Sequence, residues 1–113
     1  MGIQIFGTGK SQDTRKAERF FRERGVPFQA IDLAEKGISR GELAAVAAAV
    51  GTDGLIDTEG RRFKDRGLAW QQYDPLEEAL ADPLLLKMPI VRDGRKTVLG
   101  YAPDVWAAWL KER

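Results

Sequence analysis

Residues 3–33 read IQIFGTGKSQDTRKAERFFRERGVPFQAIDL, a pattern that predicts a strand, a helix and a second strand in direct succession. The apolar run IQIF ends at Gly7-Thr8-Gly9, as expected for a buried strand that enters a flexible loop. The segment QDTRKAERFFRER places its apolar residues on one side of a helix and is followed by Gly25, a good C-terminal cap. The final run, FQAIDL, alternates apolar and polar residues in the manner of a half-buried strand.

The sequence pattern in the middle of the chain predicts mainly helices. Ser39 with Glu42 three residues later forms a capping box, which marks the start of a helix that ends at Gly51. Residues 52–73 show weaker periodicity, with scattered Arg, Asp and Gly, and predict a loop with one or two short helical turns.

The last third of the chain predicts a short helix, a hairpin and a closing helix. Asp74 suits the N-cap of a helix that begins at Pro75 and runs to about Ala81. The Asp-Gly pair at residues 93–94 lies between two β-rich runs and is a strong hairpin signal. Pro103 opens the closing helix. The predicted buried face of that helix comprises Val105, Trp106, Trp109 and Leu110.

Length and charge narrow the classes of function. A chain of 113 residues suits one compact domain spanning residues 1–113. Its formal charge of +1 is too small to create an electrostatic field that would attract nucleic acids or anionic membranes nonspecifically. Neither direct nucleic-acid binding nor membrane binding is therefore expected. The sequence shows no apolar run near the roughly 20 residues that span a bilayer, and no signal-peptide pattern, which makes the cytoplasm the expected location.

The chain contains no cysteine and no histidine. Disulfides, thiolate zinc sites and catalytic pairs of Ser-His or Cys-His type are therefore excluded. Only carboxylates, Lys, Arg, Tyr and hydroxyl groups remain for active roles. We accordingly predict no catalytic residue and no metal ligand.

Three stretches, in order and covering nearly the whole chain, resemble the arsenate reductase (ArsC) and Spx family of thioredoxin-fold proteins. The first runs from Ile5-Phe6-Gly7 to Ala17, the second from Gly60 to Leu68, and the third from Asp82 through Met88-Pro89 to Trp106. The resemblance implies an α/β, thioredoxin/glutaredoxin-like fold: a mixed sheet of about four strands with helices on its faces and a helical insertion. It also implies a cis peptide bond before Pro89.

Three positions depart from the family pattern. The family's nucleophilic Cys falls on Ser11, the Arg before its cis-Pro falls on Met88, and its oxyanion-binding Arg falls on Asp57. A serine hydroxyl needs a general base that a thiolate does not, and an arsenate pocket needs cations around the anion. The chain is therefore not expected to be a competent thiol-dependent arsenate reductase. We expect a non-catalytic binding or regulatory module with a protein partner, RNA polymerase by analogy with Spx regulators.

The candidate ligand-binding residues lie in two segments. They are Thr8, Gly9, Lys10, Ser11, Met88 and Pro89. The first segment precedes a helix N-terminus, where backbone amides can hold an anion. The alternative function is a glutathione-binding protein or a serine-type glutathione-dependent enzyme. The resemblance implies that Ser11 would then hydrogen-bond the thiolate of glutathione and the backbone of Met88 would hold the tripeptide.

Two interpretations stay open for other features. Ser11 also suits the N-cap of the first helix, accepting a hydrogen bond from a backbone N–H group. Trp70, Tyr73 and the basic run at residues 61–64 form either an exposed recognition face or a solvated loop with ordinary core aromatics, and the second is the more common arrangement for such residues.

Overall fold

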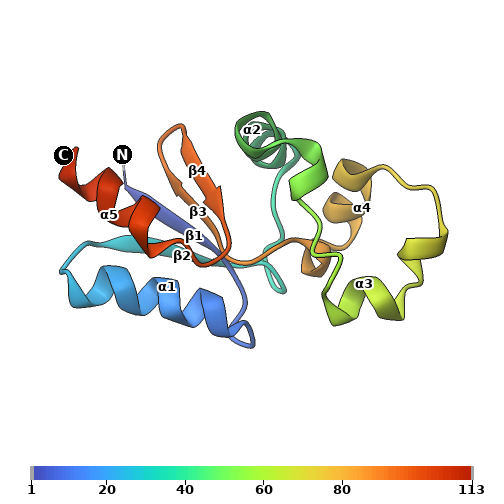
Figure 1. Ribbon diagram of the computed structural model, residues 1–113, viewed down its shortest axis with the longest axis horizontal. Helices are drawn as coiled ribbons and strands as arrows, with labels where there is room; N and C mark the ends of the chain where they lie inside the picture. The colour runs from blue at the N-terminus through green and yellow to red at the C-terminus, as the bar shows by residue number, and fades with distance from the viewer. Residues whose placement is uncertain (1, 113) are drawn as a thin grey trace.

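A computed structural model describes residues 2–112 of the chain and shows a four-stranded mixed sheet with helices on both faces and a helical insertion at one end (Figure 1). In chain order the elements are β1 (Ile3–Gly7), α1 (Gln12–Glu23), β2 (Phe28–Asp32), α2 (Arg40–Val50), η1 (Thr52–Gly54), α3 (Arg61–Asp65), η2 (Leu68–Trp70), α4 (Pro75–Ala81), η3 (Pro83–Leu85), β3 (Ile90–Asp93), β4 (Lys96–Leu99) and α5 (Pro103–Lys111).

The strands lie in the order β2-β1-β3-β4. β1 pairs with β2 in parallel and with β3 in antiparallel orientation, and β3 pairs with β4 through a hairpin. The predicted fold class is confirmed. No helix within residues 2–112 has both the length and the apolar character that a membrane crossing requires.

One face of the sheet packs against α1 and α5. Ile3 and Ile5 of β1 are buried against Phe20 and Phe21 of α1 and against Trp106 of α5. The ring of Trp106 lies 5.2 Å from that of Phe20 and 5.6 Å from that of Phe21, as aromatic pairs in a core prefer.

The predicted buried face of the closing helix is wrong at one position. Trp106 and Trp109 are buried and Leu110 packs against the same core, whereas Val105 is exposed. Successive residues of an α-helix point about 100° apart, so burying Trp106 turns Val105 toward solvent.

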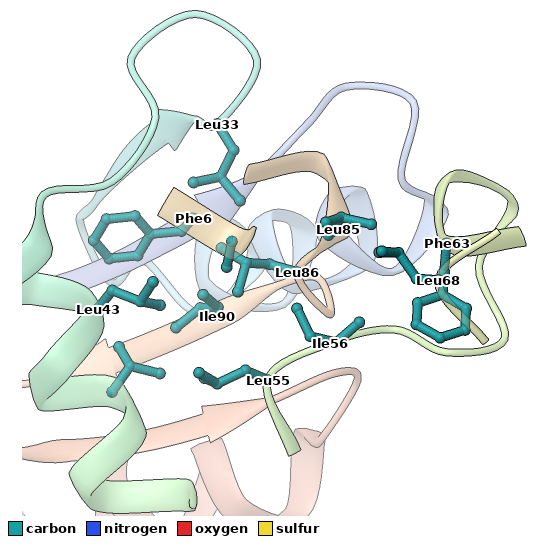
Figure 2. Close-up of a cluster of buried hydrophobic side chains, with 12 residues drawn as sticks. Phe6, Leu33, Leu43, Leu55, Ile56, Phe63, Leu68, Leu85, Leu86 and Ile90 are labelled. Carbon is teal, nitrogen blue, oxygen red and sulfur yellow. The ribbon is translucent and has the colours of Figure 1, made fainter. Parts of the chain in front are cut away.

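The opposite face of the sheet shares a core with the insertion. Figure 2 shows Phe6 of β1 and Ile90 of β3 beside Leu43 of α2, with Leu55 and Leu86 continuing the cluster toward α3. All five side chains are buried. The insertion therefore packs on the sheet as part of one hydrophobic core.

Residues 52–73 hold three short helical segments, η1, α3 and η2, where the sequence predicts one or two turns. Tertiary contacts hold this segment in place. Ile56 forms an antiparallel bridge with Leu86, and the backbone N–H of Lys87 donates to the carbonyl of Leu55 at 2.9 Å. Phe63 of α3 is buried in the shared core.

The predicted caps are confirmed. Both hydrogen bonds of the capping box between Ser39 and Glu42 are present, and the Asp74 side chain accepts from the first turn of α4. The hairpin around the Asp-Gly pair at residues 93–94 is confirmed. Asp93 pairs with Lys96, so the two-residue turn is Gly94-Arg95, and Gly94 has a φ of 65°, as a glycine at the first position of a tight hairpin turn allows.

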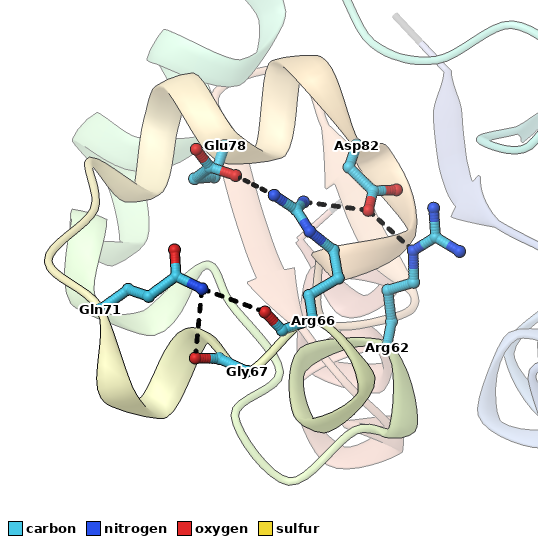
Figure 3. Close-up of polar contacts among 6 residues, drawn as sticks. All are labelled: Arg62, Arg66, Gly67, Gln71, Glu78 and Asp82. Carbon is cyan, nitrogen blue, oxygen red and sulfur yellow. Dashed lines mark hydrogen bonds and ion pairs between the residues drawn. The ribbon is translucent and has the colours of Figure 1, made fainter.

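A polar network fastens α3 to the end of α4 (Figure 3). The Asp82 side chain, 11% exposed, accepts from Arg62 Nε at 2.7 Å and from Arg66 Nη1 at 3.1 Å. Arg66 Nη2 also donates to Glu78 at 2.6 Å. Burial acts to raise the pKa of Asp82, but the hydrogen bonds from Arg62 and Arg66 outweigh it and lower the pKa below its ordinary value.

We predict that Asp82→Asn lowers the free energy of unfolding at pH 7 by about 2 kcal/mol, because two guanidinium groups lose a charged acceptor. The pKa of Asp82 is lower in the folded chain than in the unfolded chain, so the carboxylate stabilises the fold above an unfolded pKa of about 3.9. That contribution is lost as pH falls through the lowered folded value. Urea unfolding at pH 7 and at about pH 2.5 measures the difference at each pH.

Asp65→Asn is the matched control, since Asp65 lies 3.9 Å from Arg61 and both side chains are exposed. It is expected to change stability little at either pH. An Asp82→Asn effect of equal size at both pH values would contradict the assigned charge interaction.

Candidate functional site

The two predicted ligand-binding segments meet at one end of the sheet. The loop at residues 8–11 follows β1, and Met88-Pro89 comes directly before β3, the antiparallel neighbour of β1. The Thr8 hydroxyl donates to the sulfur of Met88 at 3.7 Å. The structure thus brings together segments that are far apart in the sequence.

The turn beside the loop has a defined backbone. The peptide bond between Met88 and Pro89 is cis, as the resemblance implies. Pro89 is buried, and its carbonyl accepts from the N–H of Gly100 at 2.9 Å, which ties the turn to the end of β4. Met88 is partly buried against the core shared with the insertion. Its backbone is thereby fixed while its side chain lies beside the loop.

Ser11 is the N-cap of α1, which confirms the capping interpretation. Its Oγ accepts from the backbone N–H of Thr14 at 3.2 Å, and its own N–H donates to the carbonyl of Thr8 at 3.1 Å. The chain has no histidine that could remove the hydroxyl proton. Ser11 therefore has a structural role and lacks the imidazole base that usually makes a serine nucleophilic.

The rest of the loop presents one cation and one glycine to solvent. Gly9 and Lys10 are both exposed. The Arg15 guanidinium donates to the carbonyl of Gly9 and so closes the loop onto the first turn of α1. Within residues 2–112, Lys10 forms no ion pair, so its charge is available to a binding partner.

The floor of the loop is tightly packed. A Cβ atom placed on Gly7 would lie 2.2 Å from Thr14 Oγ1, and Thr14 is 3% exposed. Only glycine fits at the end of β1 without moving α1. A cavity of about 140 Å³ lies beside this contact, lined in part by Thr8, Thr14 and Asp32.

Asp57 stabilises a local turn. Its Oδ1 accepts from the N–H of Glu59 at 3.2 Å, and its carbonyl accepts from the N–H of Gly60 at 3.1 Å. These bonds make a tight turn before α3, and aspartate commonly stabilises such turns. The position that the resemblance gives to an oxyanion-binding arginine is thus occupied by a turn-forming carboxylate.

The proposed recognition face of the insertion does not form as one surface. Phe63 is buried, with its ring 6.0 Å from that of Tyr73, and Arg62 is engaged with Asp82. Trp70 is 91% exposed, and Arg61 and Lys64 are exposed beside the turns of the insertion. The contacts of these residues favour the interpretation as a solvated loop with core aromatics.

A groove that the sequence did not predict lies between α1 and the start of α5. Its lining includes Lys16 and Arg19 of α1, Arg24 at the C-cap of α1, and Tyr101 before α5. The available signal was the row of cations on the polar side of α1, but nothing local connects that row to Tyr101. Within residues 2–112, no three acidic side chains gather into a group that could hold a metal ion.

Comparison with known proteins agrees with this geometry. The family model described as "ArsC family" matches residues 6–109. The chain is 30% identical over 110 residues to the global transcriptional regulator Spx 2 of Oceanobacillus iheyensis, covering 92% of this chain and 80% of that protein. It is 28% identical over 111 residues to YusI of Bacillus subtilis, covering 92% and 94%. The solved structure of a YffB protein superposes with a TM-score of 0.83 at 25% identity, covering 94% of this chain and 96% of that one.

We predict that Ser11→Cys creates a thiol whose pKa lies below the ordinary value of about 8.5, because the N-terminus of α1 stabilises the thiolate. Ala108→Cys, on the exposed side of α5, is the matched control in a chain that has no other cysteine. Alkylation by iodoacetamide at pH 7 should be roughly several-fold faster at position 11. Equal rates at the two positions would contradict a helix-end effect in this loop.

Proposed function

The chain belongs to the ArsC family, and we propose that it acts as a non-catalytic binding module whose protein partner docks on the loop at residues 8–11 and the turn at Met88-Pro89. The observation that carries the proposal is the state of Ser11. Its hydroxyl oxygen caps α1 at the position of the family nucleophile, in a chain that has neither cysteine nor histidine. The loop and the adjoining turn at Met88-Pro89 are present without the thiol.

The lost cations support the same proposal. Met88 and Asp57 stand where the family pattern has arginines, and Asp57 is engaged in its own turn. A pocket for a polyatomic anion relies on several charged donors. Docking of a protein partner does not require several charged donors around one anion. The exposed Lys10 and the fixed backbone of Met88 suit such docking.

The names of the relatives suggest the class of partner. Spx 2 of Oceanobacillus iheyensis is named a global transcriptional regulator, and the chain matches it over most of both lengths. We therefore propose a component of the transcription machinery as the partner, with RNA polymerase as the first to test.

Biolayer interferometry with purified RNA polymerase from the organism that encodes the chain tests this proposal. We expect saturable binding that Lys10→Glu weakens by about tenfold, which corresponds to about 1.4 kcal/mol. Arg95→Glu makes the same charge change in the hairpin turn, away from the loop, and should leave binding unchanged. The absence of saturable binding, or equal losses in the two variants, would contradict the proposal.

Glutathione binding is the second candidate function. It is favoured by the turn at Met88-Pro89 lying beside the loop before the N-terminus of α1, where backbone groups can hold a peptide ligand and its carboxylates. The loss of cations at positions 57 and 88 argues against tight binding.

Titration of ¹⁵N-labelled protein with reduced glutathione separates the two candidates. If the partner is a protein, amide shifts at residues 8–12 and 87–90 should stay flat up to millimolar ligand. Saturable shifts confined to those residues would favour the glutathione-binding function instead.

A further inference from the structure

The groove between α1 and α5 has an unusual charge balance. A cavity of about 350 Å³ lies between the two elements, lined by Lys16, Arg19 and Arg24 against a single acid, Glu23. None of the three cations forms an ion pair with any residue between 2 and 112. The groove therefore carries a net positive charge that the fold itself does not neutralise.

Aromatic rings, rather than acids, hold two of these cations. Lys16 Nζ lies 5.3 Å from the ring centroid of Tyr101, and the Arg24 guanidinium lies 3.6 Å from that of Phe20. Cation–π contacts position a charge without cancelling it. The insertion shows the opposite arrangement, since Arg62 and Arg66 are both paired with carboxylates (Figure 3).

The spacing of the cations suits an extended chain. Lys16 and Arg24 are eight residues apart on a helical rise of about 1.5 Å per residue, which places them about 12 Å apart along the axis of α1. In an extended peptide, side chains at positions i, i+2 and i+4 share one side and span about 13 Å. Three alternating carboxylates thus match the length of the row, whereas one small anion reaches only part of it.

Tyr101 adds an apolar contact at one end of the row. It is 49% exposed, and its ring packs edge-on against Trp106 at 5.6 Å, so it is held in position while presenting a surface to solvent. Tyrosine and arginine are enriched among the residues that dominate protein–protein binding energy. Tyr101 follows Gly100, whose backbone N–H donates a hydrogen bond to the carbonyl of Pro89. The groove therefore begins beside the proposed binding face at Met88-Pro89.

We propose that this groove binds an extended acidic segment of a protein partner, with alternating carboxylates on Lys16, Arg19 and Arg24 and an apolar side chain on Tyr101. The inference rests on the proposed function to the extent that both require a protein partner. It adds the chemistry of the segment that the partner supplies and the surface that receives it.

Fluorescence anisotropy with a labelled Glu-Phe peptide tests the inference, with Phe at position i, Glu at i+2, i+4 and i+6 and Ser between them, so that all four side chains share one side of the extended chain. The intact chain should bind it saturably, with affinity that falls as salt screens the charges. The double variant Lys16→Ala/Arg19→Ala should bind at least about tenfold more weakly. Arg61→Ala/Lys64→Ala removes the same charge from the exposed side of α3 and should bind within about twofold of the intact chain. The same peptide with Gln in place of Glu should not bind.

Amide shifts of the intact chain on addition of the Glu-Phe peptide give a readout that needs no variant. Shifts at Lys16, Arg19 and Tyr101 are expected. Equal binding of the Glu and Gln peptides, equal losses in the two double variants, or shifts confined to other surfaces would overturn the inference.

The two proposals can fail separately. Peptide binding in the groove without RNA polymerase binding would support the groove as a binding site for acidic segments and would reject RNA polymerase as the partner. RNA polymerase binding that is weakened by Lys10→Glu, combined with no peptide binding, would keep the proposed function and reject the groove.

Discussion

The antiparallel register of β1 and β3 is the constraint on which the candidate site depends. Phe6 lies opposite Ile90, so continuing the same register two residues beyond the paired strands sets Thr8 opposite Met88. The hydroxyl–sulfur contact between these residues follows from the pairing. Because side chains alternate across a strand, Thr8 and Met88 also lie on the side of the sheet that carries Phe6 and the core shared with the insertion.

That core explains why the helical insertion stays on the sheet. Its apolar contacts run without a break from Phe6 and Ile90 to Leu55 and Phe63. The network around Asp82 then fixes α3 against the end of α4 from the solvent side. The insertion is held by burial on one side and by the ion pairs of Asp82 and Glu78 on the other.

The sequence predicted the elements whose signals are local and missed those that depend on distant contacts. The capping box at Ser39 and the hairpin around Gly94 follow from residues close in the chain, and both are present. The short helices within residues 52–73 have no such signal, because burial of Phe63 and the bridge between Ile56 and Leu86 hold them in place.

The same distinction applies to the site. Ser11 as a cap could be predicted from its neighbours, whereas the meeting of the loop with Met88-Pro89 required the resemblance to a known family. The groove depends on Tyr101 lying over Lys16, a contact between distant parts of the chain. No local sequence pattern predicts such a contact. The exposed Val105 shows a second limit of sequence patterns. Periodicity predicts which side of a helix is buried more reliably than it predicts whether a residue at the edge of that side is buried.

The role of Ser11 explains how the fold can persist without a cysteine at the start of α1. Serine is among the best N-cap residues, so placing it at the start of α1 keeps the helix stable. A serine at this position thus requires no change elsewhere in the core. What remains near the loop is positive charge that is not neutralised by ion pairs within residues 2–112: Lys10 in the loop itself and the cations along α1. Unneutralised charge beside a rigid backbone favours recognition of another molecule over reaction with it.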